Sequence, residues 1–116
     1  MARKSLEDMV FDKSLISDKE VDRMWDLSRY PGNMDAMFRE FTESWADFNP
    51  AEVRAIATDT LLIWGEEDAI CPLSMGVWYD SHIPNATLVR LPKIGHNPQF
   101  ECPGECLEEI SSWMAR

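Results

Sequence analysis

The fold is decided by one stretch of the chain, Thr60-Leu61-Leu62-Ile63-Trp64-Gly65-Glu66-Glu67-Asp68. It opens with an apolar run that ends at Gly65 and continues into an acidic loop. A short apolar run without polar alternation is typical of a strand that is covered on both faces, as in a parallel sheet. We therefore expect a buried strand over residues 60–64, with the acidic residues at its carboxyl end.

A second strand and two helices follow this stretch. Residues 72–82 are helix-sized and end before Pro84, and Ala86–Leu91 is a second apolar run, bounded by Pro92. A strand, a helix and another strand in this order form a right-handed crossover unit with parallel strands. Because proline is favoured at the first helical position, we expect a last helix to begin near Pro103. Its apolar face would carry Leu107, Ile110, Trp113 and Met114.

The first half of the chain has the pattern of helices. Ser17-Asp18-Lys19-Glu20 has the capping-box form, in which serine and glutamate satisfy early backbone N–H groups, so a helix should begin there. Tyr30-Pro31-Gly32 should end it, and Asn33 can cap the next helix, which Asn49-Pro50 would close. The apolar residues of this second helix step by three or four, as a buried helix face does. They are Met34, Met37, Phe38, Phe41, Trp45 and Phe48.

Composition argues against several classes of protein. The chain has 116 residues, of which 45% are hydrophobic and 28% charged, which suits one small domain rather than a disordered or coiled-coil chain. Its net charge of −10 repels phosphate backbones and anionic lipids, so we expect neither nucleic-acid binding nor membrane docking. No stretch approaches the roughly 20 apolar residues of a membrane span, and the start lacks the apolar core of a secretory peptide. We expect a cytoplasmic location.

The three cysteines indicate reduced thiols. Cys71, Cys102 and Cys106 form an odd set at irregular spacing, which does not suit a disulfide framework. His96 with Cys102 and Cys106 could form part of a zinc site, but paired ligand spacing is absent and we expect no metal. Cys71 is interpreted as a small apolar filler in an acidic loop. Cys102 and Cys106 lie near a helix start, where the helix dipole can lower a thiol pKa, so surface reactivity is an open alternative.

A sheet of two parallel strands is incomplete. Each strand has an outer edge of unpaired backbone groups, and a run as apolar as residues 61–64 needs neighbouring strands and helices on both faces. Either these edges pair with another polypeptide or another copy of the chain, or the chain is one piece of a larger domain.

The two loops that leave the carboxyl ends of the strands carry the candidate catalytic residues. Open α/β sheets place their ligands at this edge, and the crossover should bring Asp68 and His96 side by side there. A carboxylate can accept from the imidazole Nδ1–H and leave Nε2 to take a proton from a nucleophile or a water. Glu66 or Glu67 could replace Asp68 as the orienting acid if the loop has another shape.

Residues of the second half, taken in their order and separation, carry a resemblance to a known family. They are the stretch from Thr60 to Asp68, Pro72, Ile83-Pro84-Asn85-Ala86, Gly95-His96-Asn97-Pro98, Glu101 and Pro103. Together they closely resemble the carboxyl-terminal part of α/β-hydrolase fold enzymes. The helical first half is similar, more loosely, to the lid of that family, particularly of its carbon–carbon bond hydrolases and esterases.

This resemblance implies a fold class, a division of the chain and a set of roles. The chain would be a partial α/β-hydrolase fold, with a helical lid-like segment over residues 1–57 and a β-α-β-α section over residues 58–116. Asp68 would be the acid and His96 the base of a Ser-His-Asp type triad, and Trp64 would line an apolar substrate pocket. The family's reaction needs no metal or organic cofactor, and the substrate would be a small apolar ester or carbon–carbon bond compound.

The sequence departs from the family in one large respect. None of its five glycines begins a G-x-S-x-G motif, so the nucleophile elbow is absent, as is the oxyanion loop. A smaller departure is Asp59, where the family often has proline. We expect a chain that supplies acid and base but is inactive alone, its nucleophile lying on another chain or in upstream sequence cut off by a truncated or split reading frame. The alternative is a non-catalytic binding or assembly module that uses its open strand edges.

Overall fold

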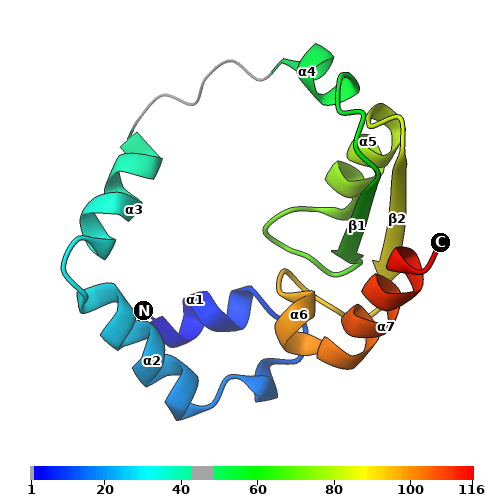
Figure 1. Ribbon diagram of the computed structural model, residues 1–116. Helices are drawn as coiled ribbons and strands as arrows, with labels where there is room; N and C mark the ends of the chain where they lie inside the picture. The colour runs from blue at the N-terminus through cyan, green and yellow to red at the C-terminus, as the bar shows by residue number, and fades with distance from the viewer. Residues whose placement is uncertain (1, 43–48) are drawn as a thin grey trace.

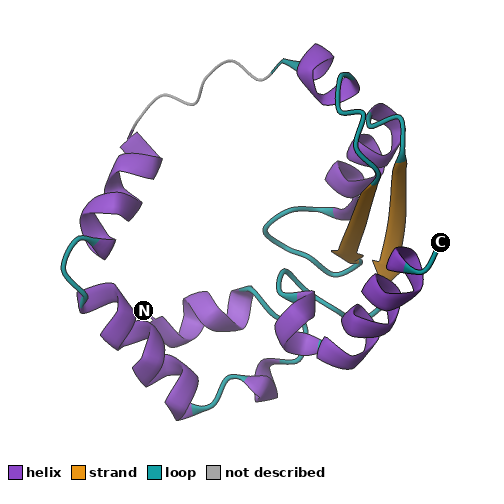
Figure 2. Ribbon diagram, viewed as in Figure 1, coloured by secondary structure: helices purple, strands orange, loops and turns teal. Residues whose placement is uncertain are grey.

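The computed structural model describes residues 2–42 and 49–116. In chain order its elements are α1 (Ala2–Asp8), the 3₁₀ helix η1 (Lys13–Leu15), α2 (Asp18–Arg29), α3 (Asn33–Thr42), α4 (Pro50–Arg54), β1 (Thr60–Gly65), α5 (Leu73–His82), β2 (Ala86–Leu91), α6 (Pro98–Glu101) and α7 (Pro103–Met114). They follow one another around an open arrangement, with α2 and α3 on one side and the two strands on the other (Figure 1). Figure 2 shows that helices dominate and that both strands lie together.

The sheet confirms the predicted α/β crossover unit. β1 and β2 run parallel and in register from Thr60 opposite Ala86 to Gly65 opposite Leu91, and α5 connects them. Within the described ranges the sheet contains these two strands alone, so each has one unpaired edge. α5 and α7 both contact β1, yet residues 60–64 are only partly buried. The expected cover on both faces is therefore incomplete among the described residues.

Helix boundaries follow the capping signals, with one correction. Ser17 caps α2, since Glu20 N–H donates to its Oγ at 3.5 Å and the serine hydroxyl donates to the Glu20 carboxylate. Asn33 does not cap α3 but is its first residue, and its Nδ2 donates to Leu27 O at 2.8 Å. Asn49 opens α4, because its Oδ1 accepts from Ala51 N–H at 3.0 Å, and the predicted end of the preceding helix lies outside the described residues.

Little of the apolar surface is buried. The buried apolar residues of the described chain are Val10, Ile16, Ile83, Leu91, Cys102 and Cys106. The predicted helix faces are largely exposed instead, as Phe38 in α3 (59%) and Met114 in α7 (73%) show. Trp45, Phe48 and the side chain of Phe41 fall outside the described residues. The radius of gyration is 16.5 Å, above the about 13 Å of a compact domain of this size.

Gly65 marks the closest approach between the two loops at the carboxyl ends of the strands. A Cβ at Gly65 would lie 2.1 Å from Gly95 O and 2.4 Å from Ile94 O. The loops are also joined by backbone hydrogen bonds, from Glu66 N–H to Leu91 O and from Glu67 N–H to Ile94 O, each at 3.0 Å. The absence of a side chain at residue 65 therefore lets the loops that hold the candidate residues lie against each other.

None of the described helices is long and apolar enough to span a membrane.

Gly65→Ala should destabilise the chain by about 3 kcal/mol, the upper end of the range for overpacking, because the new methyl group meets backbone atoms that cannot rotate away. Gly104→Ala is the matched control, since it lies in α7 with no atom within 4 Å of its Cβ position and should be neutral or stabilising by up to about 1 kcal/mol. Urea denaturation followed by circular dichroism measures both. Equal midpoints for the two variants would contradict the close approach.

Candidate active site

Asp68 and His96 meet at the carboxyl ends of the two strands. Asp68 lies in the loop after β1 and His96 in the loop after β2, and the distance from His96 Nδ1 to Asp68 Oδ2 is 2.9 Å. The Asp68 side chain is 6% exposed and the His96 side chain 29%. An Nδ1–H that donates to this carboxylate fixes the tautomer in which Nε2 carries the free lone pair. Glu66 and Glu67, the alternative acids, are exposed.

The Asp68 carboxylate is held by its own loop as well as by His96. Its Oδ1 accepts from the backbone N–H groups of Ile70 and Cys71, each at 2.8 Å. Burial on its own would raise the pKa of Asp68, but the hydrogen bonds from Cys71, His96 and Ile70 together lower it below the ordinary value. The carboxylate therefore stays charged at neutral pH, as an acid that stabilises an imidazolium must.

The pair lines a small cavity. The cavity has a volume of about 180 Å³, and its lining residues are Ile63, Trp64, Gly65, Asp68, Cys71, His96 and Pro98. Trp64 is anchored within this wall: its indole N–H donates to Cys71 O at 2.8 Å, and a Cβ at Gly76 in α5 would lie 2.8 Å from its ring. The contact of Trp64 with a substrate stays a prediction.

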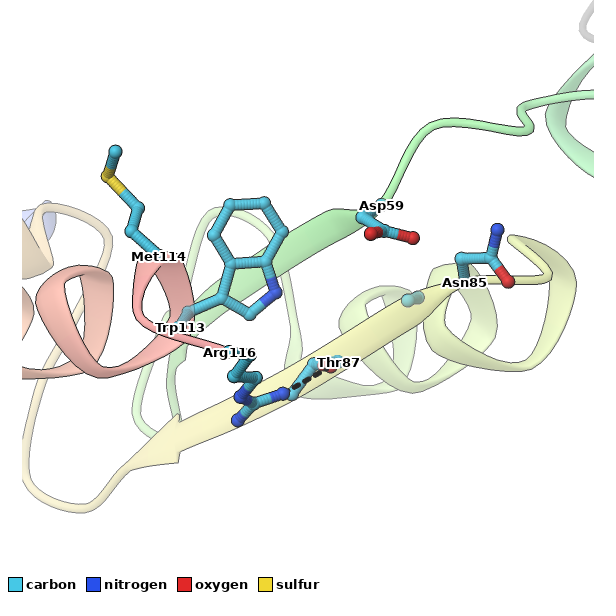
Figure 3. Close-up of a pocket in the computed structure, with 7 residues that line it drawn as sticks. Asp59, Asn85, Thr87, Trp113, Met114 and Arg116 are labelled. Atoms are coloured by element: carbon cyan, nitrogen blue, oxygen red, sulfur yellow. Dashed lines mark hydrogen bonds between the residues drawn. The ribbon is translucent and has the colours of Figure 1, made fainter.

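A larger cavity lies at the opposite end of the sheet. Its volume is about 550 Å³, and Asp59 and Asn85 mark the amino ends of β1 and β2 beside the last turn of α7. Figure 3 shows Trp113, Met114 and Arg116 over this end, with Arg116 Nη1 donating to Thr87 Oγ1 at 3.3 Å. It contains neither Asp68 nor His96, so its size does not make it the candidate active site.

Other histidine, serine and cysteine side chains of the second half occupy structural positions. His82 ends α5, where its Nδ1 lies 2.8 Å from Trp78 O and its ring stacks on Trp78 at 3.8 Å. Ser74 is exposed in the first turn of α5. Cys102 and Cys106 are buried, and burial together with Cys106 and nearby carboxylates raises the pKa of Cys102 to about 11. Because both thiols are buried, surface reactivity is not supported.

Sequence reasoning missed the groups that hold the pair in place. The two backbone N–H groups that donate to Asp68 form an Asx turn, and an aspartate in a loop is a general sequence signal for such a turn. The contact of His96 N–H with Met9 O, at 2.8 Å, joins residues far apart in the chain and had no local signal. No group of three or more His, Cys, Asp or Glu side chains suited to a metal ion occurs in the part of the chain that the structure describes.

With this geometry in place, comparison with known proteins identifies the class. Residues 2–103 match the family described as the alpha/beta hydrolase fold. The chain therefore belongs to the α/β-hydrolase fold family, as the order of its motifs indicates.

Individual relatives are hydrolases of bacteria. The chain is 32% identical over 111 residues to the uncharacterized hydrolase YugF of Bacillus subtilis (strain 168), which covers 96% of the chain and 41% of that protein. It is 31% identical over 119 residues to the 2-hydroxymuconate semialdehyde hydrolase of Pseudomonas putida, covering 97% of the chain and 42% of the relative. The chain thus spans about two fifths of the length of the curated relatives that it matches.

Solved structures show the same fold. A variant of the meta-cleavage product hydrolase CumD, an enzyme of Pseudomonas fluorescens IP01, superposes with a TM-score of 0.88 at 24% identity, over 98% of this chain and 44% of that one. The 2-hydroxy-6-oxo-6-phenylhexa-2,4-dienoate hydrolase from Rhodococcus sp. strain RHA1 gives 0.83 at 20% identity, over 99% of this chain and 43% of that one. The two-stranded unit and the helices before it therefore match one part of a larger α/β-hydrolase fold.

The lowered pKa of Asp68 predicts a pH dependence of stability. Because the folded-state pKa lies below the unfolded one, the charged carboxylate stabilises the fold above the unfolded value, and this contribution is lost as the pH falls into the acid range. The free energy of unfolding of the wild-type chain should therefore rise, relative to Asp68→Asn, as the pH increases through the acid range.

Urea titrations at several pH values measure this difference. Glu66→Gln is the control, because it removes an exposed carboxylate from the same loop and should keep the wild-type profile. A constant difference between wild type and Asp68→Asn across the acid range would show that the Asp68 hydrogen bonds do not hold the charged form.

Proposed function

We propose that this chain supplies the acid and the base of a Ser-His-Asp type triad in an α/β-hydrolase that cleaves a small apolar ester or carbon–carbon bond substrate. The observation that carries the proposal is the 2.9 Å contact between His96 Nδ1 and the buried carboxylate of Asp68, in a chain that belongs to this family. The names of its relatives support the substrate class, since several are hydrolases of 2-hydroxy-6-oxo dienoates or of 2-hydroxymuconate semialdehyde.

In this proposal each residue has a defined step. His96 Nε2 takes the proton of the attacking hydroxyl or water and later returns it to the leaving group. Asp68 holds the imidazole orientation and stabilises the imidazolium that forms. The small cavity between Ile63 and Pro98 would receive the reacting end of the substrate, with Trp64 in its wall. Residues 1–57 would serve as the lid segment that covers it.

The proposal assigns the nucleophile to residues outside these 116. None of the glycines opens a G-x-S-x-G motif, and oxyanion donors and a positioned nucleophile carry much of the rate enhancement in acyl transfer. On its own the chain should therefore hydrolyse activated esters little faster than imidazole in solution. A polypeptide with the nucleophile, or a sequence continuous with this one, would complete the enzyme.

A chimera tests the proposal. In it, this chain replaces the matched segment of the Pseudomonas putida 2-hydroxymuconate semialdehyde hydrolase, and hydrolysis of that enzyme's substrate is measured. His96→Gln and Asp68→Asn should each lower kcat, by about 10²–10⁴-fold for the base, because proton transfer at Nε2 is lost. His82→Gln is the control and should keep the rate, since His82 caps α5 away from the pair. A folded chimera whose rate does not depend on His96 would contradict the proposed function.

A second candidate function is a non-catalytic assembly module, either joined to a partner chain or self-associated. The observation that favours it is the two-stranded sheet, whose outer edges are unpaired in the described residues, together with exposed apolar faces on α3 and α7. If assembly is the function, the purified chain should form a stable dimer or larger species whose population rises with concentration. Light scattering coupled to size exclusion measures this, and a monomer with a cooperative unfolding transition would contradict it.

A further inference from the structure

One carboxylate organises the backbone on both sides of His96. Glu101, the last residue of α6, accepts from Gly95 N–H with both oxygens, at 2.9 and 3.0 Å, and from Asn97 N–H at 3.3 Å. The residues immediately before and after the histidine are thus tied to the same side chain. A charged acceptor makes hydrogen bonds stronger than neutral ones, and its two oxygens offer enough lone pairs for several donors.

The same carboxylate reaches a distant part of the chain. Glu101 Oε2 also accepts from Phe11 N–H at 2.8 Å, and His96 N–H donates to Met9 O at 2.8 Å. The segment Met9–Phe11, which follows α1, is therefore joined to the histidine loop by two hydrogen bonds. Figure 1 shows the end of α1 and the loop after it beside α6.

Gly95 makes this contact sterically possible. A Cβ at Gly95 would lie 2.9 Å from Phe11 N and 3.0 Å from Met9 O, so the two backbones touch with no room for a side chain. Both Gly95 and Val10 are buried, whereas the hydrogen bond from Phe11 N–H to Glu101 lies at the surface. The contact is consequently a packed junction between the first helical segment and the loop that carries the imidazole.

We propose that Glu101 is a positioning residue, which together with the segment Met9–Phe11 clamps the backbone of His96 so that its Nδ1 meets Asp68. The clamp couples the placement of α1 to the orientation of the base, so a displacement of α1 would change the orientation of the His96 imidazole. This inference rests on the proposed function for the role of His96 as a base, but the geometry of the clamp can be tested without an activity assay.

Glu101→Gln is the informative substitution. It keeps the shape of the side chain but replaces one acceptor oxygen by an NH₂ donor, which would face backbone N–H groups that also donate. A side chain that only fills space would tolerate this change, whereas a side chain that accepts from three N–H groups would not. Glu101→Asp keeps the charge and both acceptor oxygens, so it should retain part of the hydrogen bonding that Glu101→Gln loses. Glu105→Gln is the matched control, because Glu105 is an exposed carboxylate in the first turn of α7.

Proton NMR of the full chain supplies the readout. The chain contains two histidines, so the downfield Nδ1–H signal of His96 can be assigned by its loss in Asp68→Asn and its retention in His82→Gln. Glu101→Gln should remove or broaden this signal and speed amide hydrogen exchange at Gly95, Asn97 and Phe11 by about tenfold or more. Amides of β1 and β2 should keep their protection, which shows that the strands remain folded.

The NMR signal and the amide exchange rates together decide the inference. Loss of the Nδ1–H signal in Glu101→Gln, with the strand amides protected and Glu105→Gln unchanged, supports it; an unchanged signal and unchanged exchange overturn it. If Glu101→Gln also unfolds the strands, amide hydrogen exchange is measured in the wild-type chain instead. The amides of Phe11, Gly95 and Asn97 should then exchange through one common opening, and separate opening free energies for them would overturn the clamp. An inactive chimera with an intact NMR signature would reject the proposed function but leave the clamp standing.

Discussion

The structure depends on the parallel pairing of β1 and β2. Because the strands run in the same direction and end level, at Gly65 and Leu91, the loops that follow them emerge at one edge of the sheet. Two side chains that are distant in sequence, Asp68 and His96, then need only short loops to meet at 2.9 Å. An antiparallel pairing of the same strands would place those loops at opposite ends, and no local hydrogen bond could compensate for that separation.

The second level of organisation comes from backbone groups rather than from side chains. Asp68 is held by two N–H groups of its own loop, and His96 is held by its own N–H and those of its two neighbours. A carboxylate and an imidazole on flexible loops would lose rotational freedom on pairing, at a cost in free energy. In this chain the loops are already ordered by these backbone bonds, so the pair is preorganised.

Sequence reasoning predicted the crossover unit because its signals are local. The apolar run before Gly65, the break at Pro84 and the start at Pro103 each act within a few residues, and the strands and the last helix follow them. It predicted that the apolar face of the helix with Phe38 would be buried, yet Phe38 is 59% exposed, because burial depends on elements that pack across a face and local periodicity does not specify them. The contacts of Glu101 with Phe11 were equally hidden, since they join segments whose proximity only the fold creates.

In this acidic chain, association through the strand edges that are unpaired in the described residues is opposed by charge repulsion. With a net charge of −10, two copies repel each other, and this repulsion opposes edge-to-edge pairing in dilute buffer. At about 0.15 M ionic strength the screening length falls to roughly 8 Å, and the repulsion no longer extends far beyond the surface. Ionic strength, more than protein concentration alone, should then govern whether preparations of the chain stay dispersed.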